Sequence, residues 1–234
     1  MERVPAQGEI AHASETWEEP GGGGAVAAVQ LARLAGACTF FTALGEERVE
    51  TTFRPEPQRR AFTFLDDEAE RTITLLGPKL HPHAADPLPW RELAEIDAVY
   101  FCAGDAGALR AARQARVVVA TARELPTLRD AAVELDAVVA SADDPEELYR
   151  AHDVEPSPRL VVRTKGAGGG SYEPGGSWET APVPGPVRDA YGAGDSFAAG
   201  LAFALSLGRP PAEALAFAAR CGAEALTRRG AHGA

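Results

Sequence analysis

The sequence has 234 residues, of which 45% are hydrophobic and 24% charged, and its formal net charge is −11. A chain of this size and composition can bury one sizeable core, so we expect one domain over residues 1–234. The negative charge, with no basic stripe to offset it, argues against nucleic acid and an anionic membrane as partners. The most apolar stretch, residues 197–207, is too short to span a bilayer.

The cysteines indicate a reducing compartment. Cys38, Cys102 and Cys221 are odd in number, widely spaced and surrounded by apolar residues. This pattern predicts buried, reduced thiols rather than a disulfide or metal framework. Since the chain also opens with no secretory signal pattern, we expect a cytoplasmic protein.

The first part of the chain combines a glycine run with a strong helix. Residues 1–20 are polar and turn-rich, with a short strand expected at residues 9–13. Pro20 leads into the glycines at residues 21–24, and a helix is predicted over residues 25–34. Glycines at a helix start let a ligand or another backbone come close. The alternative, a flexible linker, is less favoured because the helix begins abruptly.

Two further features precede the regular part of the chain. Residues 38–45 are predicted to form a buried strand. Residues 61–65 and 71–76 alternate in polarity around the acidic turn 66–70, which predicts a β-hairpin.

From residue 96 onward, short β-branched runs alternate with amphipathic segments. The expected strands are residues 98–102, 116–120, 137–140 and 159–164, and the expected helices are residues 107–114, 128–134 and 145–151. Such alternation predicts a doubly wound α/β fold, with a mainly parallel sheet flanked by helices. Ligands of these sheets bind at the carboxyl ends of strands, here near residues 141–144 and 164–170. Residues 172–186 are expected to form a loop or a hairpin.

The stretch from Asp189 to Gly208 carries the strongest chemical signal. A glycine-containing turn delivers Asp195 to the first turn of a helix that is apolar on most faces and therefore buried. The free N–H groups and the dipole at this helix end suit a phosphoryl group. Asp195 would then take the proton of a substrate hydroxyl as that oxygen attacks the phosphoryl group. The alternative is that the glycines only make a turn and Asp195 caps the helix. A second apolar helix is expected over residues 211–226.

In their order along the chain, these features resemble the ribokinase-like sugar kinases, also called the phosphofructokinase-B family. The resemblance covers nearly the whole chain and is strongest from Asp189 to Gly200. It implies that Asp195 is the catalytic base and that Gly192, Ala193 and Gly194 form the anion hole over the transferring phosphate. Asp189 matches a position that helps to hold a monovalent cation such as K⁺ in members that need one.

The resemblance also implies a site for ATP. Thr164 and Gly166 match the family's Thr-x-Gly loop, which lies along the nucleotide. Ala219 and Gly222, in the last predicted helix, would lie near the adenine ring.

A magnesium contact follows from the same comparison. Where the family has an Asn-x-x-Glu motif that organises magnesium and phosphate, this chain has Ser141 and Asp144. Asp144 is therefore expected to act through water on nucleotide-bound Mg²⁺. The competing interpretation is that residues 141–145 are an ordinary helix start.

The glycine run matches the family's substrate signature at Gly21, Gly22 and Gly24. Two positions that offer polar groups to sugar hydroxyls in ribokinase-type members are Gly23 and Val26 here. This difference points away from an ordinary sugar as the acceptor.

In the family, a small β lid covers the substrate, and residues 61–76 with strands from residues 1–20 match it. Lids often pair between two subunits, so a homodimer through the lid is one expectation and a plain surface hairpin is the other. The family's first central strand, whose end commonly supplies an aspartate for substrate hydroxyls, has no counterpart here. The chain thus resembles an atypical member that is short at its N-terminus.

The sequence therefore predicts an ATP-dependent kinase that transfers a phosphoryl group to a hydroxyl of a sugar, a nucleoside or a similar small molecule. The alternative is a non-catalytic nucleotide- or metabolite-binding protein on a degenerate version of the same fold. The residues at positions 23, 26 and 141 and the missing strand favour that alternative.

Overall fold

The computed structural model describes residues 7–8, 12, 16–44, 52–53, 57–67 and 71–230. The strand expected at residues 9–13 lies outside these ranges except for residue 12. Over the described residues, no helix combines the length and the apolar character that crossing a bilayer requires.

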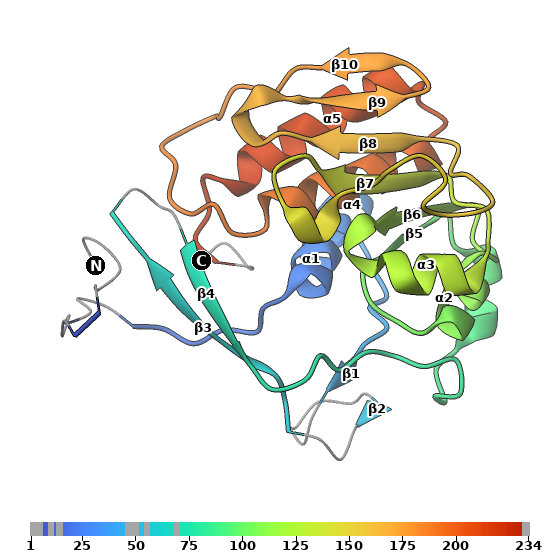
Figure 1. Ribbon diagram of the computed structural model, residues 1–234, viewed down its shortest axis with the longest axis horizontal. Coiled ribbons are helices and arrows are strands. Elements are labelled where there is room, and N and C mark those ends of the chain that lie inside the picture. Colours follow the sequence, from blue (N-terminus) through green and yellow to red (C-terminus); the bar gives the residue numbers. More distant parts are fainter. Residues whose placement is uncertain are drawn as a thin grey trace.

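A six-stranded sheet forms the centre of the molecule, with the strand order β10–β9–β8–β7–β6–β5 (Figure 1). Its parallel strands are β5 (Ala98–Phe101), β6 (Val117–Thr121), β7 (Ala137–Ser141) and β8 (Val161–Thr164). Two antiparallel strands complete it, β9 (Gly170–Glu173) and β10 (Gly176–Trp178). The predicted α/β fold with a mainly parallel sheet is confirmed, and the first part of the segment 172–186 is a hairpin.

Helices cover both faces of this sheet and create two apolar cores. On one face, Val118 and Ala120 of β6 pack with α2 (Ala106–Ala112) and α3 (Leu125–Ala131). On the other face, Val117 and Val119 pack with α4 (Ala193–Ser206) and α5 (Pro211–Ala225). A strand that is buried on both sides has no polar face to present. This explains why β6 is a continuous apolar run rather than an alternating one.

The first helix, α1 (Gly23–Ala35), packs against α4. It begins two residues before the predicted helix and includes two of the glycines. Gly36 ends it in a left-handed conformation with φ of 81°, and its N–H bonds back to the carbonyl of Ala32. The glycine run therefore leads directly into a helix that packs on α4, and it is not a linker.

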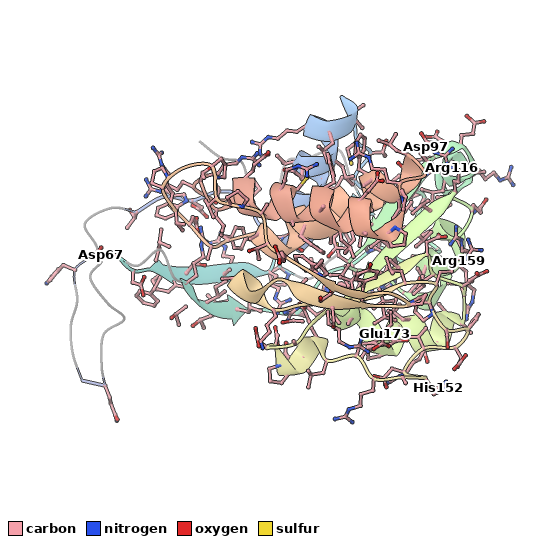
Figure 2. The ribbon with its side chains drawn as sticks, turned by 90° about the horizontal axis from the view of Figure 1, so that it is seen from above. Asp67, Asp97, Arg116, His152, Arg159 and Glu173 are labelled. Carbon is pink, nitrogen blue, oxygen red and sulfur yellow. The ribbon has the colours of Figure 1, made fainter. Side chains whose placement is uncertain are left out.

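The predicted hairpin is present as β3 (Arg60–Leu65) and β4 (Arg71–Leu76), which form a separate antiparallel sheet. This pair projects from the body of the molecule (Figure 1). Figure 2 shows Asp67, beyond the end of β3, far from Asp97, Arg116 and Arg159, which precede strands of the main sheet. The hairpin thus lies toward the carboxyl ends of the parallel strands.

The strand predicted over residues 38–45 is mostly wrong. Only Ala43–Leu44 form a strand, β1, and it pairs with β2 (Thr52–Phe53) outside the main sheet. The aromatic side chains of the run pack elsewhere: Phe41 meets Trp90 edge-on at 5.2 Å between ring centroids, and Phe40 is exposed. Among the described residues no strand pairs with the outer edge of β5, so β5 ends the sheet.

Two other local predictions need correction. The helix expected at residues 145–151 is only a 3₁₀ turn, Pro145–Glu147, because Tyr149 turns into the core instead of continuing the helix. All three cysteines are free, but of the three only Cys221 is buried as predicted. Cys102 is half-buried and Cys38 is exposed, since the predicted strand around Cys38 does not form.

The packing of α4 generates a stability prediction. Leu201 is fully buried between α4 and the sheet, whereas Leu207, just past the end of the same helix, is 57% exposed. We expect Leu201→Ala to lower the free energy of unfolding by about 2–5 kcal/mol, because it leaves a cavity. Leu207→Ala should change it by no more than about 0.5 kcal/mol. Urea unfolding of both variants measures this, and equal losses would contradict the described packing.

Candidate active site

Asp195 lies in the first turn of α4, at the edge of a cleft beside the carboxyl ends of the parallel strands. Gly192 is the N-cap of this helix, so the interpretation of Asp195 as the cap is wrong. The hydroxyl of Tyr100, from β5, lies 3.5 Å from Oδ1 of Asp195, which is longer than a full-strength hydrogen bond. On another side, a Cβ placed on Gly23 would lie 2.4 Å from the same oxygen. The carboxylate is thus held between β5 and the start of α1.

The surroundings of Asp195 make it more basic than an ordinary carboxylate. Burial raises the pKa of Asp195 to about 6, and the nearby charge of Glu147 adds to this shift. The charges of Arg123 and Lys79 and the contact with Tyr100 lower the pKa of Asp195 but do not cancel the rise. A carboxyl group of this kind is still deprotonated at neutral pH and is well suited to accept a proton.

The turn before α4 is shaped by packing on one side and open on the other. Gly192 has φ of 77°, and a Cβ there would lie 2.6 Å from the side chain of Val26. Both the backbone conformation and the available space therefore require glycine. A Cβ on Gly194, in contrast, would meet nothing within 4 Å. The first N–H groups of α4, at Ala193 and Gly194, have no partner within the helix, and the space beside Gly194 is open.

The glycine run packs against the same region. A Cβ on Gly21 would lie 2.9 Å from the hydroxyl of Tyr191, and the backbone N–H of Gly22 donates to that hydroxyl. A Cβ on Gly24 would lie 2.9 Å from the ring of Phe40 and 3.2 Å from Sγ of Cys102. Gly21 and Gly22 thus bring the start of α1 close to Tyr191 in the segment before α4, and Gly24 brings it close to the end of β5.

Gly23 and Val26 both have packing roles. Val26 is 4% exposed and fills the space beside Gly192, so it is not a cleft residue. Gly23 stands where any larger residue would collide with Asp195. The inference that these two residues point away from a sugar acceptor stays a prediction, and packing gives a second reason for both residue types.

Asp189 is fully buried and forms an ion pair with Arg71 of the hairpin. The guanidinium of Arg71, in β4, forms a two-pronged pair with both carboxylate oxygens. The backbone N–H groups of Tyr191 and Gly230 donate to the same carboxylate, at 3.0 and 2.8 Å. Burial alone would raise the pKa of Asp189, but these hydrogen bonds outweigh it and hold the pKa below its usual value.

Asp144 is the N-cap of the 3₁₀ turn after β7, as the helix-start interpretation predicts. One of its oxygens accepts the N–H of Glu146 at 2.9 Å, and the other accepts from Arg123 at 2.7 Å. Arg123 also pairs with Glu147 at 2.6 Å. Both oxygens of Asp144 are thus engaged by this chain's own groups.

The remaining predicted nucleotide residues divide into two groups. Thr164 ends β8 and lines the cleft, and Gly166 follows it with φ of 44°. Ala219 is buried in the core, and a Cβ on Gly222 would lie 3.2 Å from the carbonyl oxygen of Ala193. Ala219 and Gly222 therefore act in the packing of α5 on α4, and neither is among the cleft-lining residues of the described part of the chain.

Three cleft residues were missed by sequence reasoning. Arg71 and Tyr100 each stand within a predicted strand, where they resemble ordinary strand residues, and Arg123 follows β6 in a segment without a recognised motif. A signal existed only for Arg123, because it directly follows the carboxyl end of a buried parallel strand.

Comparisons with known proteins identify the family and support the fold. The profile of the family described as pfkB family carbohydrate kinase matches residues 2–234. Among curated proteins, none matches the chain significantly.

Solved structures show the same fold. A ribokinase from Thermotoga maritima is 20% identical with a TM-score of 0.72, and the match covers 99% of this chain and 89% of that one. A ribokinase from Arabidopsis thaliana, in complex with ribose and ATP, is 18% identical with a TM-score of 0.66, covering 98% and 88%. A nucleoside kinase from Methanocaldococcus jannaschii is 16% identical with a TM-score of 0.68, covering 99% and 88%. The chain belongs to the pfkB family of carbohydrate kinases, which are phosphotransferases with an alcohol group as acceptor.

Proposed function

We propose that this protein transfers the γ-phosphoryl group of ATP to a hydroxyl of a sugar, a nucleoside or a related small molecule. The observation that carries the proposal is the position of Asp195. This carboxylate, with a pKa of about 6, lies in the first turn of α4 beside a glycine turn whose outer side is open. A base and a set of N–H groups that suit a phosphate thus share one helix end.

In this mechanism, Asp195 takes the proton of the acceptor hydroxyl while the hydroxyl oxygen bonds to the γ-phosphorus. The bond from that phosphorus to the bridging oxygen breaks, and ADP leaves with its electron pair. The N–H groups at Gly192, Ala193 and Gly194 face the negative charge on the transferring oxygens. The proton on Asp195 is released to solvent after the product departs.

For the nucleotide, Thr164 and Gly166 are the residues that we propose as contacts, because they follow the carboxyl end of β8 and Thr164 lines the cleft. The positions of Ala219 and Gly222 suit a role in placing α4 rather than a direct contact with adenine.

Magnesium bound to the nucleotide would neutralise phosphate charge. Asp144 does not fit as a direct metal ligand, since Arg123 and a backbone N–H engage its two oxygens. Among the described residues no group of three His, Cys, Asp or Glu side chains is placed to hold a metal. We therefore assign no step to a metal held by the protein, and Asp144 contacts the metal through water or not at all.

The first prediction concerns the base. We expect Asp195→Asn to lower kcat by at least about 100-fold, because the amide cannot accept the proton, while ATP still binds. Asp130→Asn is a matched control, since this aspartate is exposed, lies in α3 and is not a cleft-lining residue. ADP release across a panel of sugars and nucleosides measures the activity. A variant that keeps wild-type turnover would exclude Asp195 as the base.

The same panel distinguishes the alternative function. If the wild type binds ATP but phosphorylates no acceptor, a non-catalytic nucleotide-binding protein is the better description.

The pH dependence tests the environment of Asp195. The value of kcat/KM should fall below a midpoint near pH 6, because protonated Asp195 cannot act as a base. Glu147→Gln should move the midpoint to lower pH, since the Glu147 charge raises the pKa of Asp195. Tyr100→Phe should move it to higher pH, since the Tyr100 contact lowers the pKa of Asp195. Shifts in the same direction for both variants would contradict this account.

We also propose that this protein acts in the cytoplasm and that two copies form a homodimer through the hairpin. Phe62 and Leu76 are 57% and 54% exposed and share the face that also carries Phe64, whose ring lies 4.9 Å from that of Phe62. Arg71 belongs to the opposite face, because side chains alternate along a strand. An exposed apolar face on a two-stranded sheet supports pairing with a second copy.

The dimer generates its own prediction. Phe62→Glu should convert a particle of twice the monomer mass into a monomer, because it places charge in the apolar contact. Leu207→Glu is the control, because this leucine is equally exposed but lies at the end of α4. Light scattering after size-exclusion chromatography gives the masses. If the wild type has the mass of a monomer, the dimer proposal is wrong and the hairpin is a plain surface feature.

A further inference from the structure

Asp189 is the residue that the family resemblance connects with a monovalent cation, and its surroundings do not fit such an ion. Its side chain is 1% exposed, and four donors reach its two oxygens. A metal ion placed there would find no free carboxylate oxygen and would meet the positive charge of Arg71.

Arg71 already supplies a positive charge at this position. Its side chain is 10% exposed, and Nε donates to Oδ1 of Asp189 at 2.5 Å while Nη2 donates to Oδ2. Its guanidinium carbon lies over the ring of Tyr191, 4.3 Å from the centroid. Two-pronged pairing and stacking on an aromatic ring are geometries that a guanidinium provides and a lysine does not.

The pair also connects the hairpin to the candidate active site. Arg71 is the first residue of β4, and Asp189 lies on the segment that leads into the turn at Gly192. Tyr191, between them, accepts the N–H of Gly22 with its hydroxyl. The hairpin, the glycine run and the turn before α4 therefore meet at one buried ion pair.

We propose that Arg71 is a positioning residue that acts as a built-in cation: it holds Asp189, and with it the turn before α4, in place of a dissociable monovalent ion. The activity of this protein is then independent of K⁺. The kinetic part of this inference rests on the proposed kinase function, but the structural part does not.

Thermal unfolding tests the structural part. Tm is measured in KCl, NaCl and choline chloride at equal ionic strength. The wild type should melt at the same temperature in all three salts, because Arg71 occupies the cation position. Arg71→Gln should melt lower and should be stabilised by KCl over choline chloride, because Asp189 then lacks its cation. Arg91→Gln, an exposed arginine in the 3₁₀ segment Trp90–Glu95 and away from the hairpin, should behave as the wild type.

Turnover tests the kinetic part with the acceptor found in the panel. Wild-type kcat should be equal in the three salts. Arg71→Gln should lose about 10-fold to 100-fold in kcat, as displaced catalytic groups do, and KCl should restore part of this loss. Arg71→Lys, which keeps the charge but not the two-pronged geometry, covers the case in which Arg71→Gln does not fold. Its kcat should fall without any gain from KCl.

The outcomes separate the two proposals. Stabilisation or activation of the wild type by K⁺ would overturn the role of Arg71, as would an Arg71→Gln variant that acquires no dependence on K⁺. If no acceptor is phosphorylated in any salt, the proposed kinase function fails, and the melting series still decides the role of Arg71.

Discussion

The fixed position of α4 is the constraint on which the candidate site depends. This helix packs against α1, α5 and strands β5 and β6, and small residues allow the close approach. A Cβ on Gly200 would lie 2.8 Å from Sγ of Cys221, and one on Gly222 would lie 3.2 Å from the carbonyl oxygen of Ala193. Protein interiors at this density leave no room for a helix to shift. The amino end of α4, and Asp195 with it, therefore has one position relative to the cleft.

Two aspartates near that helix end have opposite electrostatic environments. Asp189 has a guanidinium and two backbone N–H groups, and its pKa is lowered. Among the described residues, Asp195 has only a long contact with Tyr100, and burial raises its pKa to about 6. A carboxylate that is fully satisfied suits a structural role, whereas one with unused basicity suits proton transfer. The difference between the two environments follows from their partners, because the residue type is the same.

The parts of the structure that the sequence predicts well are those set by local periodicity. The parallel strands were found because burial on both faces requires continuous apolar runs such as residues 117–120, and the helix that carries Asp195 was found because a glycine turn precedes an apolar run. Residues 38–45 were predicted wrongly because an apolar run does not reveal its partner. Phe41 packs on Trp90, and Cys38 and Phe40 are exposed. The partner of Asp189 could not be predicted. Arg71 is distant in sequence, and only the placement of the hairpin brings the two together.

The glycine run shows that one residue can meet two requirements at once. From the sequence, Gly23 represents a lost polar contact to a sugar. In the structure, a Cβ at this position would lie 2.4 Å from Oδ1 of Asp195, so glycine also leaves room for that carboxylate. Val26 likewise fills the space beside Gly192. Packing thus provides a second reason for both residues. Other walls of the cleft carry Phe40, Cys102 and Lys79. Those side chains are further positions at which to search for specificity.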